Sequence, residues 1–145
     1  MADRVPTYID TTTQQISEIA LGDGLDVAGG DVKAGTFTET VAPVDYNGTN
    51  ATADLSKANN FDMNFSAGGT YTFALTGAPS GAGDAYGCTL TLDTTNMAAL
   101  TWGSNVQWSG GAAPTLEADT VNVITFITTD GGTSFKGFVG GQAFA

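Results

Sequence analysis

Two tryptophans in one short stretch are the residues of this chain best suited to contacting a ligand. Trp102 and Trp108 lie in TWGSNVQWSGGAAPTL, residues 101–116, where a Gly-Gly pair and a proline follow the second tryptophan. Exposed, nearly coplanar indoles would form a platform on which a sugar ring could stack, since indoles are large and flat with one polar edge. The same two residues could equally pack in the core on either side of a tight corner.

Polar and aromatic neighbours would complete a binding surface at this corner. The candidate ligand or partner residues are Trp102, Asn105 and Trp108, joined by Asp84 and Tyr86 from a Gly-rich loop and the start of the next strand. The ligand interpretation holds only for an indole that faces solvent. The spacing favours a structural corner, because Gly110 and Gly111 permit a sharp turn.

Catalytic and metal-binding residues are sparse. The chain has no histidine, which excludes the usual hydrolase triads and histidine-containing metal sites. Two carboxylates across a cleft could still cleave a glycoside, but Asp84, Asp93, Asp119 and Asp130 fall in predicted turns, where Asp bonds to the backbone. The fragment at residues 22–26 matches one calcium-binding repeat, and such sites need stacked copies. We predict a protein without enzymatic activity, cofactor or metal.

Charge limits the classes of partner. Among 145 residues there are 4 basic and 15 acidic ones, giving a formal net charge of −11. A chain this acidic is not expected to bind nucleic acid, which needs clustered Lys and Arg, or an anionic membrane surface. Lys57 and Lys136 are isolated cations and are interpreted as partners in surface or subunit-interface ion pairs.

The single cysteine and the amino terminus bear on the compartment. Cys88 lies in the alternating stretch CTLTLD, which predicts a small buried residue, and it has no second cysteine with which to form an intrachain disulfide. The first ten residues, MADRVPTYID, lack the apolar core of a signal peptide. We therefore expect synthesis in a cytoplasm.

Period-2 alternation and frequent Thr and Gly predict an all-β fold. The predicted strands are TFTETVAPVDY, NNFDMNFS, GGTYTFALTG, CTLTLD, AALTW, NVQW, VNVITFITT and SFKGFVG. Asn47-Gly48, SAGG and DGGT are interpreted as hairpin connections, and VNVITFITT as a central strand. About eight strands at this spacing predict an antiparallel, jelly-roll-like β-sandwich over residues 36–145 with most aromatic residues in its core.

Residues 1–35 have too little apolar surface for a core and are predicted to form an extended N-terminal arm. Extended segments are expected around Val5–Ile9 and Gln15–Leu21. The residues predicted to contact a partner through this arm are Val5, Tyr8, Ile9, Ile16, Ile19 and Leu21.

Three quoted motifs together carry a family resemblance. The stretch DLSKANNFDMNFSAGGTYTFALTG, the corner WGSNVQWSGGAAPTL and the closing VNVITFITTDGGTSFKGF resemble a β-module of tailed-phage virion proteins, found in fibre and appendage proteins and in capsid-attached proteins. The likeness covers roughly residues 51–141. Phe135 and Lys136 depart from it, because an aromatic pair often stands there.

The resemblance implies a non-enzymatic, homotrimeric or otherwise oligomeric part of a virion. One compact domain with an arm and no shaft fits a capsid decoration, or cement, protein whose arm orders against the major capsid protein or other virion subunits. The alternative is a short tail fibre, spike or appendage module that binds a host receptor or surface glycan. The localisation expected is the virion, after synthesis in the host cytoplasm.

Overall fold

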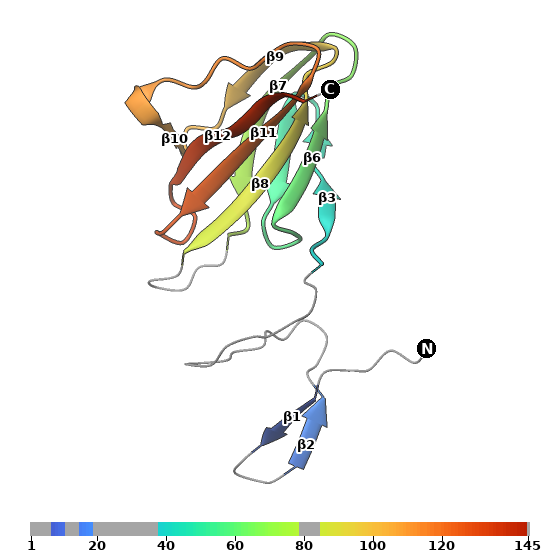
Figure 1. The fold of residues 1–145 in the computed structure, drawn as a ribbon, viewed down its shortest axis with the longest axis vertical. Helices are drawn as coiled ribbons and strands as arrows, with labels where there is room; N and C mark the ends of the chain where they lie inside the picture. Colours follow the sequence, from blue (N-terminus) through green and yellow to red (C-terminus); the bar gives the residue numbers. More distant parts are fainter. Residues whose placement is uncertain (1–6, 11–14, 19–37, 79–84, 145) are drawn as a thin grey trace. The chain divides into compact units, whose positions relative to one another are not determined.

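The computed structural model describes residues 7–10, 15–18, 38–78 and 85–144, and it divides the chain into two units (Figure 1). The first unit is Met1–Phe37 and the second is Thr38–Ala145. In the first unit, β1 (Thr7–Asp10) pairs antiparallel with β2 (Gln15–Glu18), and Ile9 lies opposite Ile16. The two strands overlap the extended segments expected from the sequence.

The second unit consists of two sheets. The six-stranded sheet has the order β10 (Val106–Trp108), β12 (Phe135–Phe144), β11 (Val121–Thr128), β8 (Tyr86–Asp93), β6 (Asn60–Asn64) and β3 (Val41–Pro43). The four-stranded sheet has the order β4 (Asp45–Asn47), β5 (Asn50–Asp54), β7 (Gly69–Thr76) and β9 (Met97–Trp102). A single 3-10 turn, η1 (Ser109–Gly111), follows β10. Within the described residues, no helical segment has the length and apolar character needed to cross a membrane.

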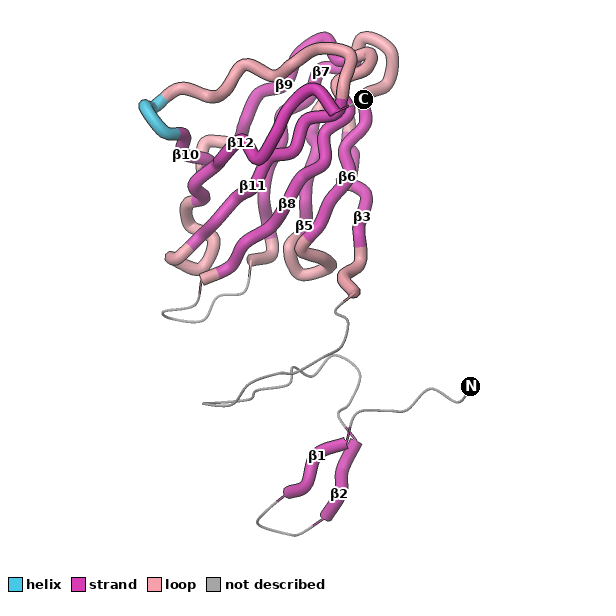
Figure 2. The backbone as a smooth tube through the Cα atoms, in the orientation of Figure 1, coloured by secondary structure: helices cyan, strands magenta, loops and turns pink. Residues whose placement is uncertain are grey.

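The two sheets lie face to face as layers, which confirms the predicted all-β sandwich (Figure 2). Pairing within the layers is mixed, whereas antiparallel, jelly-roll-like pairing was predicted. From β5 to β10 each successive strand lies in the opposite sheet. Neighbours in a sheet are therefore two strands apart in sequence and run the same way, so β5–β7, β7–β9 and β6–β8 are parallel pairs.

This alternation corrects one predicted hairpin and leaves two in place. The connection SAGG joins β6 of one sheet to β7 of the other, so it is a crossover and not a hairpin. The turns at Gly48 and at Gly131-Gly132 do close antiparallel hairpins, β4–β5 and β11–β12. β11 lies inside the six-stranded sheet between β12 and β8, as predicted for the most apolar strand.

The predicted first strand, TFTETVAPVDY, is divided in two. β3 begins at Val41 and ends at Pro43, whose missing N–H cannot continue a ladder. Val44 then enters the core with 3% of its surface exposed, and β4 starts in the other sheet. The chain thus crosses from one layer to the other at Val44.

The core lies between the layers and is built from inward positions of alternating strands. Its largest fully buried side chains include Phe73 of the four-stranded sheet and Phe61, Phe126 and Phe135 of the six-stranded sheet. The rings of Phe73 and Phe126 stack across the layers with centroids 5.9 Å apart. Cys88 is buried as predicted, and this burial raises the pKa of its thiol to about 12.

Candidate functional site

The two tryptophans end successive strands that belong to opposite sheets. Trp102 is the last residue of β9, and Trp108 is the last residue of β10 at one edge of the six-stranded sheet. Their ring centroids are 5.0 Å apart and their planes meet at 65°. An edge-to-face pair does not present two coplanar indole faces, so it does not form the stacking platform that a sugar would need.

Both indoles pack onto the core at this end of the sandwich. Their centroids lie 5.8 Å (Trp102) and 6.1 Å (Trp108) from that of Phe126, and Trp102 also meets Phe73 edge-on at 5.6 Å. Both tryptophans are half-buried. We call Trp102, Trp108 and the residues between them the tryptophan corner, and its packing follows the structural interpretation of the sequence.

Gly137 makes room for Trp108. The two residues lie opposite each other in the parallel pair β10–β12. A Cβ atom built on Gly137 would lie 2.5 Å from Cζ3 and 2.7 Å from Cη2 of the indole, well inside contact distance. Only glycine leaves the six-membered ring of Trp108 free to lie directly on the backbone of β12.

The indole nitrogen of Trp108 makes no hydrogen bond to the protein. Nε1 is buried and has no acceptor among the described residues. Burial of an indole N–H without an acceptor costs free energy. The packing of the ring on Gly137 and Phe126 must therefore outweigh that cost, and Trp108 contributes here as an apolar residue.

Asn105 holds the corner together. Its Nδ2 donates to the backbone oxygen of Leu75, 3.3 Å away, and its own backbone oxygen accepts from the N–H of Phe135 at 2.8 Å. Leu75 belongs to the four-stranded sheet and Phe135 to the six-stranded sheet. Asn105 therefore links the layers, and its amide is already used in that link.

Tyr86 serves a similar purpose elsewhere and does not join the tryptophans. Its hydroxyl lies 3.1 Å from the backbone oxygens of Leu55 and Ala58, and within hydrogen-bond distance of the side chain of Asn59. Burial raises the pKa of the Tyr86 phenol above its usual range, so the hydroxyl stays protonated and can donate. No aromatic pair among the described residues joins Tyr86 to either indole.

The remaining predicted contact residues are only partly described. Asp84, the fifth residue of the candidate surface, lies outside the described residues. Of the arm residues, Val5, Ile19 and Leu21 lie outside them as well, as does the Gly22–Asp26 fragment, while Tyr8, Ile9 and Ile16 are described only as backbone in β1 and β2.

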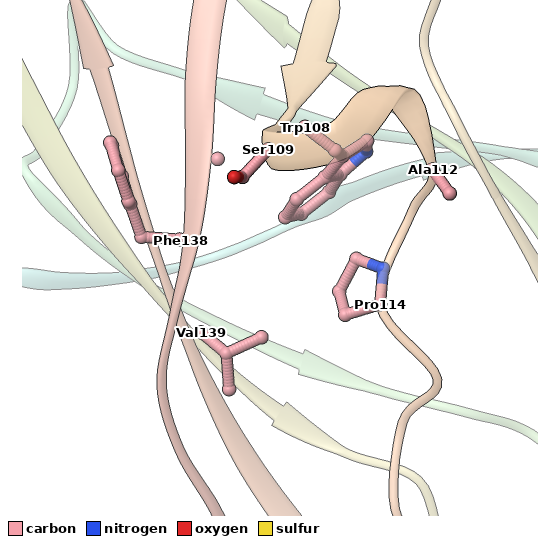
Figure 3. Close-up of a pocket in the computed structure, with 7 residues that line it drawn as sticks. Trp108, Ser109, Ala112, Pro114, Phe138 and Val139 are labelled. Atoms are coloured by element: carbon pink, nitrogen blue, oxygen red, sulfur yellow. The ribbon is translucent and has the colours of Figure 1, made fainter.

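Three shallow depressions border Trp108. The smallest, about 260 Å³, has Lys136 in its lining, and two larger ones do not. One of the two larger depressions has a volume of about 310 Å³ and lies between β12 and the segment after η1. Figure 3 shows Phe138 and Val139 of β12 on the left of it and Trp108, Ala112 and Pro114 to their right. The other, about 420 Å³, lies beside Trp102 and Ser104. Both are within the volume range of small-ligand sites, but neither is lined by a charged residue.

The acidic side chains of the turns bond to their own loops. The carboxylate of Asp130 accepts hydrogen bonds from the hydroxyls of Ser134 and Thr128 and from the N–H of Ser134. These bonds, the one from the Ser134 hydroxyl foremost, lower the pKa of Asp130 to about 2. Such a carboxylate remains ionised at neutral pH and cannot act as a general acid. Among the described residues, no three His, Cys, Asp or Glu side chains come together to hold a metal ion.

An apolar surface on the outside of the six-stranded sheet is the feature that the sequence analysis missed. Phe138 was expected in the core, yet 49% of it is exposed, and Ile127 is 39% exposed. In the β11–β12 ladder Phe138 lies opposite Thr125 and Lys136 opposite Ile127. Tyr46 and Phe144 are likewise exposed and not in the core. Glycines at residues 137 and 140 interrupt the apolar–polar alternation of β12. The sequence pattern therefore did not show which of its side chains face outward.

No family model, no curated protein and no solved structure matches this chain. Function must therefore be argued from the residues, the geometry above and the resemblance noted in the sequence. The tryptophan corner is a packing arrangement. Of the acids predicted in turns, Asp119 and Asp130 lie in turns, whereas Asp93 is the last residue of β8, because the ladder with β11 extends to Val121. The remaining features that could act outside the molecule are its exposed surfaces and its N-terminal unit.

Proposed function

We propose that this chain is a non-enzymatic structural protein of a phage virion. The role favoured is that of a capsid decoration, or cement, protein, which binds the outside of the shell and stabilises it. It would attach through its N-terminal arm and act as an oligomer of its β-sandwich. The resemblance implies a trimer.

The division of the chain into two units carries the proposal. The described part of the first unit is one hairpin of two four-residue strands. A two-stranded hairpin is at best marginally stable in water and gains stability by packing against another surface. An N-terminal unit of this kind suits attachment to a subunit outside the sandwich, where ordering on binding spans a large surface.

Several weak contacts made by one oligomer give a high overall affinity for a particle. A shell presents the same site many times, so an oligomer that places several arms on it binds far more tightly than one arm does. The net charge of −11 keeps the free protein soluble and limits unspecific association. These properties fit a protein that coats a surface.

The test is binding to capsids of the phage that encodes the chain, assembled without it. The full chain should co-sediment with the capsids and appear at a copy number set by capsid symmetry. A variant lacking residues 1–35 should lose most of that binding while its sandwich melts at the same temperature. If the truncated variant bound as well as the full chain, the arm would have no role in attachment. If the full chain did not bind at all, the proposal would be wrong.

The depressions beside the tryptophan corner favour a second candidate, a tail fibre or appendage module that binds a host glycan. Trp102, Trp108 and Ser104 are among the residues that line the depression of about 420 Å³. A glycan array would detect such binding, and Ser104→Trp, which fills the depression from an exposed position, should abolish it. A capsid-symmetric copy number in the virion would decide against this candidate.

A further inference from the structure

The outward side of β11 and β12 carries a patch of mainly apolar side chains. We define the outer patch as Val123, Thr125, Ile127 and Phe138, which alternate with the buried residues of β11 and β12. The ladder places Phe138 opposite Thr125 and diagonal to Ile127, so their side chains adjoin on one face. Exposed apolar side chains that adjoin on one face can mark a site of protein–protein contact.

Opposite charges lie at the two ends of this patch. At one end Lys136 is paired with Ile127 across the β11–β12 ladder, and at the other Asp93 is paired with Val121 across the β8–β11 ladder. The six-residue span of β11 between those rows is about 20 Å long, so Lys136 and Asp93 of one chain cannot reach each other.

Neither charge has an ion-pair partner in the part of the chain that the structure describes. Lys57 bonds to Asp45 at 2.7 Å, whereas Lys136 has no ion-pair partner among the described residues. Asp93 accepts the N–H of Thr95 at 2.9 Å and has no ion-pair partner among the described residues. A strongly acidic chain that presents one of its few cations beside an apolar patch offers a place for an acidic partner.

We propose that the outer patch binds a second copy of this chain through a two-fold axis. Such an interface is made by the same patch on both copies, so a residue at one end of it meets the residue at the opposite end of the partner. Lys136 of each copy would then face Asp93 of the other, on either side of an apolar centre formed by Val123 and Phe138. The patch is self-complementary because its end charges have opposite sign.

This contact stands on the outer patch alone and does not require the proposed role in a virion. It also differs from the trimer that the resemblance implies, since a two-fold interface gives a dimer. The N-terminal unit of the same chain and an unrelated acidic protein are the other candidate occupants. The experiment below separates them, because only a second copy changes the mass of the purified protein.

Sedimentation equilibrium of the full chain over a wide concentration range tests the proposal. The mass should approach twice 14.7 kDa as concentration rises. Phe138→Asp should raise the dissociation constant at least tenfold, because it puts a charge at the centre of both halves. Val41→Asp is the matched control: Val41 is 54% exposed on β3 of the same sheet but outside the patch, and the variant should dimerise normally.

A double-mutant cycle tests the charge pairing. Lys136→Met keeps the apolar stem, and Asp93→Asn keeps an oxygen for the Thr95 N–H. Each should raise the dissociation constant about three- to tenfold, since two exposed ion pairs are lost per dimer. The double variant should be no weaker than either single one. The proposal would be overturned if the protein were a monomer at all concentrations or a trimer. It would also be overturned if Phe138→Asp left the dimer unchanged, or if the effects of the two charge substitutions on the dissociation constant were fully additive.

Discussion

Replacing Gly137 by alanine would place a methyl group inside the indole ring of Trp108. The new Cβ would lie 2.5–2.8 Å from three ring carbons, where contacts shorter than 3.0 Å force a displacement. The ring is confined by Phe126 and Trp102, so it cannot move away freely. Overpacking of this kind costs about 1–3 kcal/mol of unfolding free energy, which for a chain of this length lowers Tm by about 3–10 °C.

Gly87→Ala is the matched control, because Gly87 lies in the same sheet and a Cβ there meets only the backbone oxygen of Phe126 at an ordinary 3.6 Å. Neither glycine has a φ in the left-handed region, so alanine fits both backbones. Gly87→Ala should be neutral or stabilising by up to about 1 kcal/mol, since it restricts the unfolded chain. Thermal unfolding followed by circular dichroism measures both variants.

A second substitution identifies the clash itself. Phenylalanine at residue 108 has a shorter ring, so Gly137→Ala should cost less in a Trp108→Phe background than in the wild type. Equal costs in the two backgrounds, or a Gly137→Ala variant as stable as Gly87→Ala, would refute the account of why glycine is needed there.

Three further substitutions, at Asn105, Asn122 and Asp130, and one labelling experiment on Cys88 give additional predictions. Asn105→Ala removes the link to Leu75 and should lower the unfolding free energy by about 1–2 kcal/mol, measured by urea titration. Asn122→Ala should cost about 1–3 kcal/mol, because the fully buried amide bonds to the backbone of Glu117. The pKa of Asp130 is about 2 in the folded protein and near 4 in the unfolded chain. The ionised carboxylate therefore stabilises the fold fully above pH 4, and this contribution is lost as the pH falls to about 2. Between these two pH values, the Tm of the Asp130→Asn variant should fall less than the Tm of the wild type. A thiol reagent at pH 8 should label Cys88 only after unfolding, because burial raises the pKa of its thiol to about 12, and rapid labelling of the native protein would contradict this.

Strand positions and inward faces could be predicted from the sequence because alternation identifies buried positions directly. Phe61, Met63, Leu90 and Leu92 are all buried, as the period-2 pattern indicates. Alternation does not reveal which of two apolar layers a strand joins, and a four-residue connection such as SAGG is long enough either for a hairpin or for a crossover. The mixed topology was therefore not predictable from these patterns.

The tryptophan corner was identified from its residue types, but its partners were not. Gly137 and Phe126 meet Trp108 through the register of β10, β12 and β11, which involves residues far apart in sequence. The separation of Tyr86 from the corner depends on the same register. Phe138 was assigned to the core because glycines near it leave the inward and outward positions of β12 undefined in the sequence. Its outward position follows only from the register of the β11–β12 ladder.

The alternation of successive strands between sheets has a consequence for the order of folding during synthesis. Each strand from β5 to β8 has one neighbour that is synthesised after it, and β8 and β10 pair with the last two strands, β11 and β12. Topologies dominated by non-local pairs fold slowly, because loops must close before contacts form. We expect the nascent sandwich to remain open until its last strand leaves the ribosome, and then to close both layers in one cooperative step.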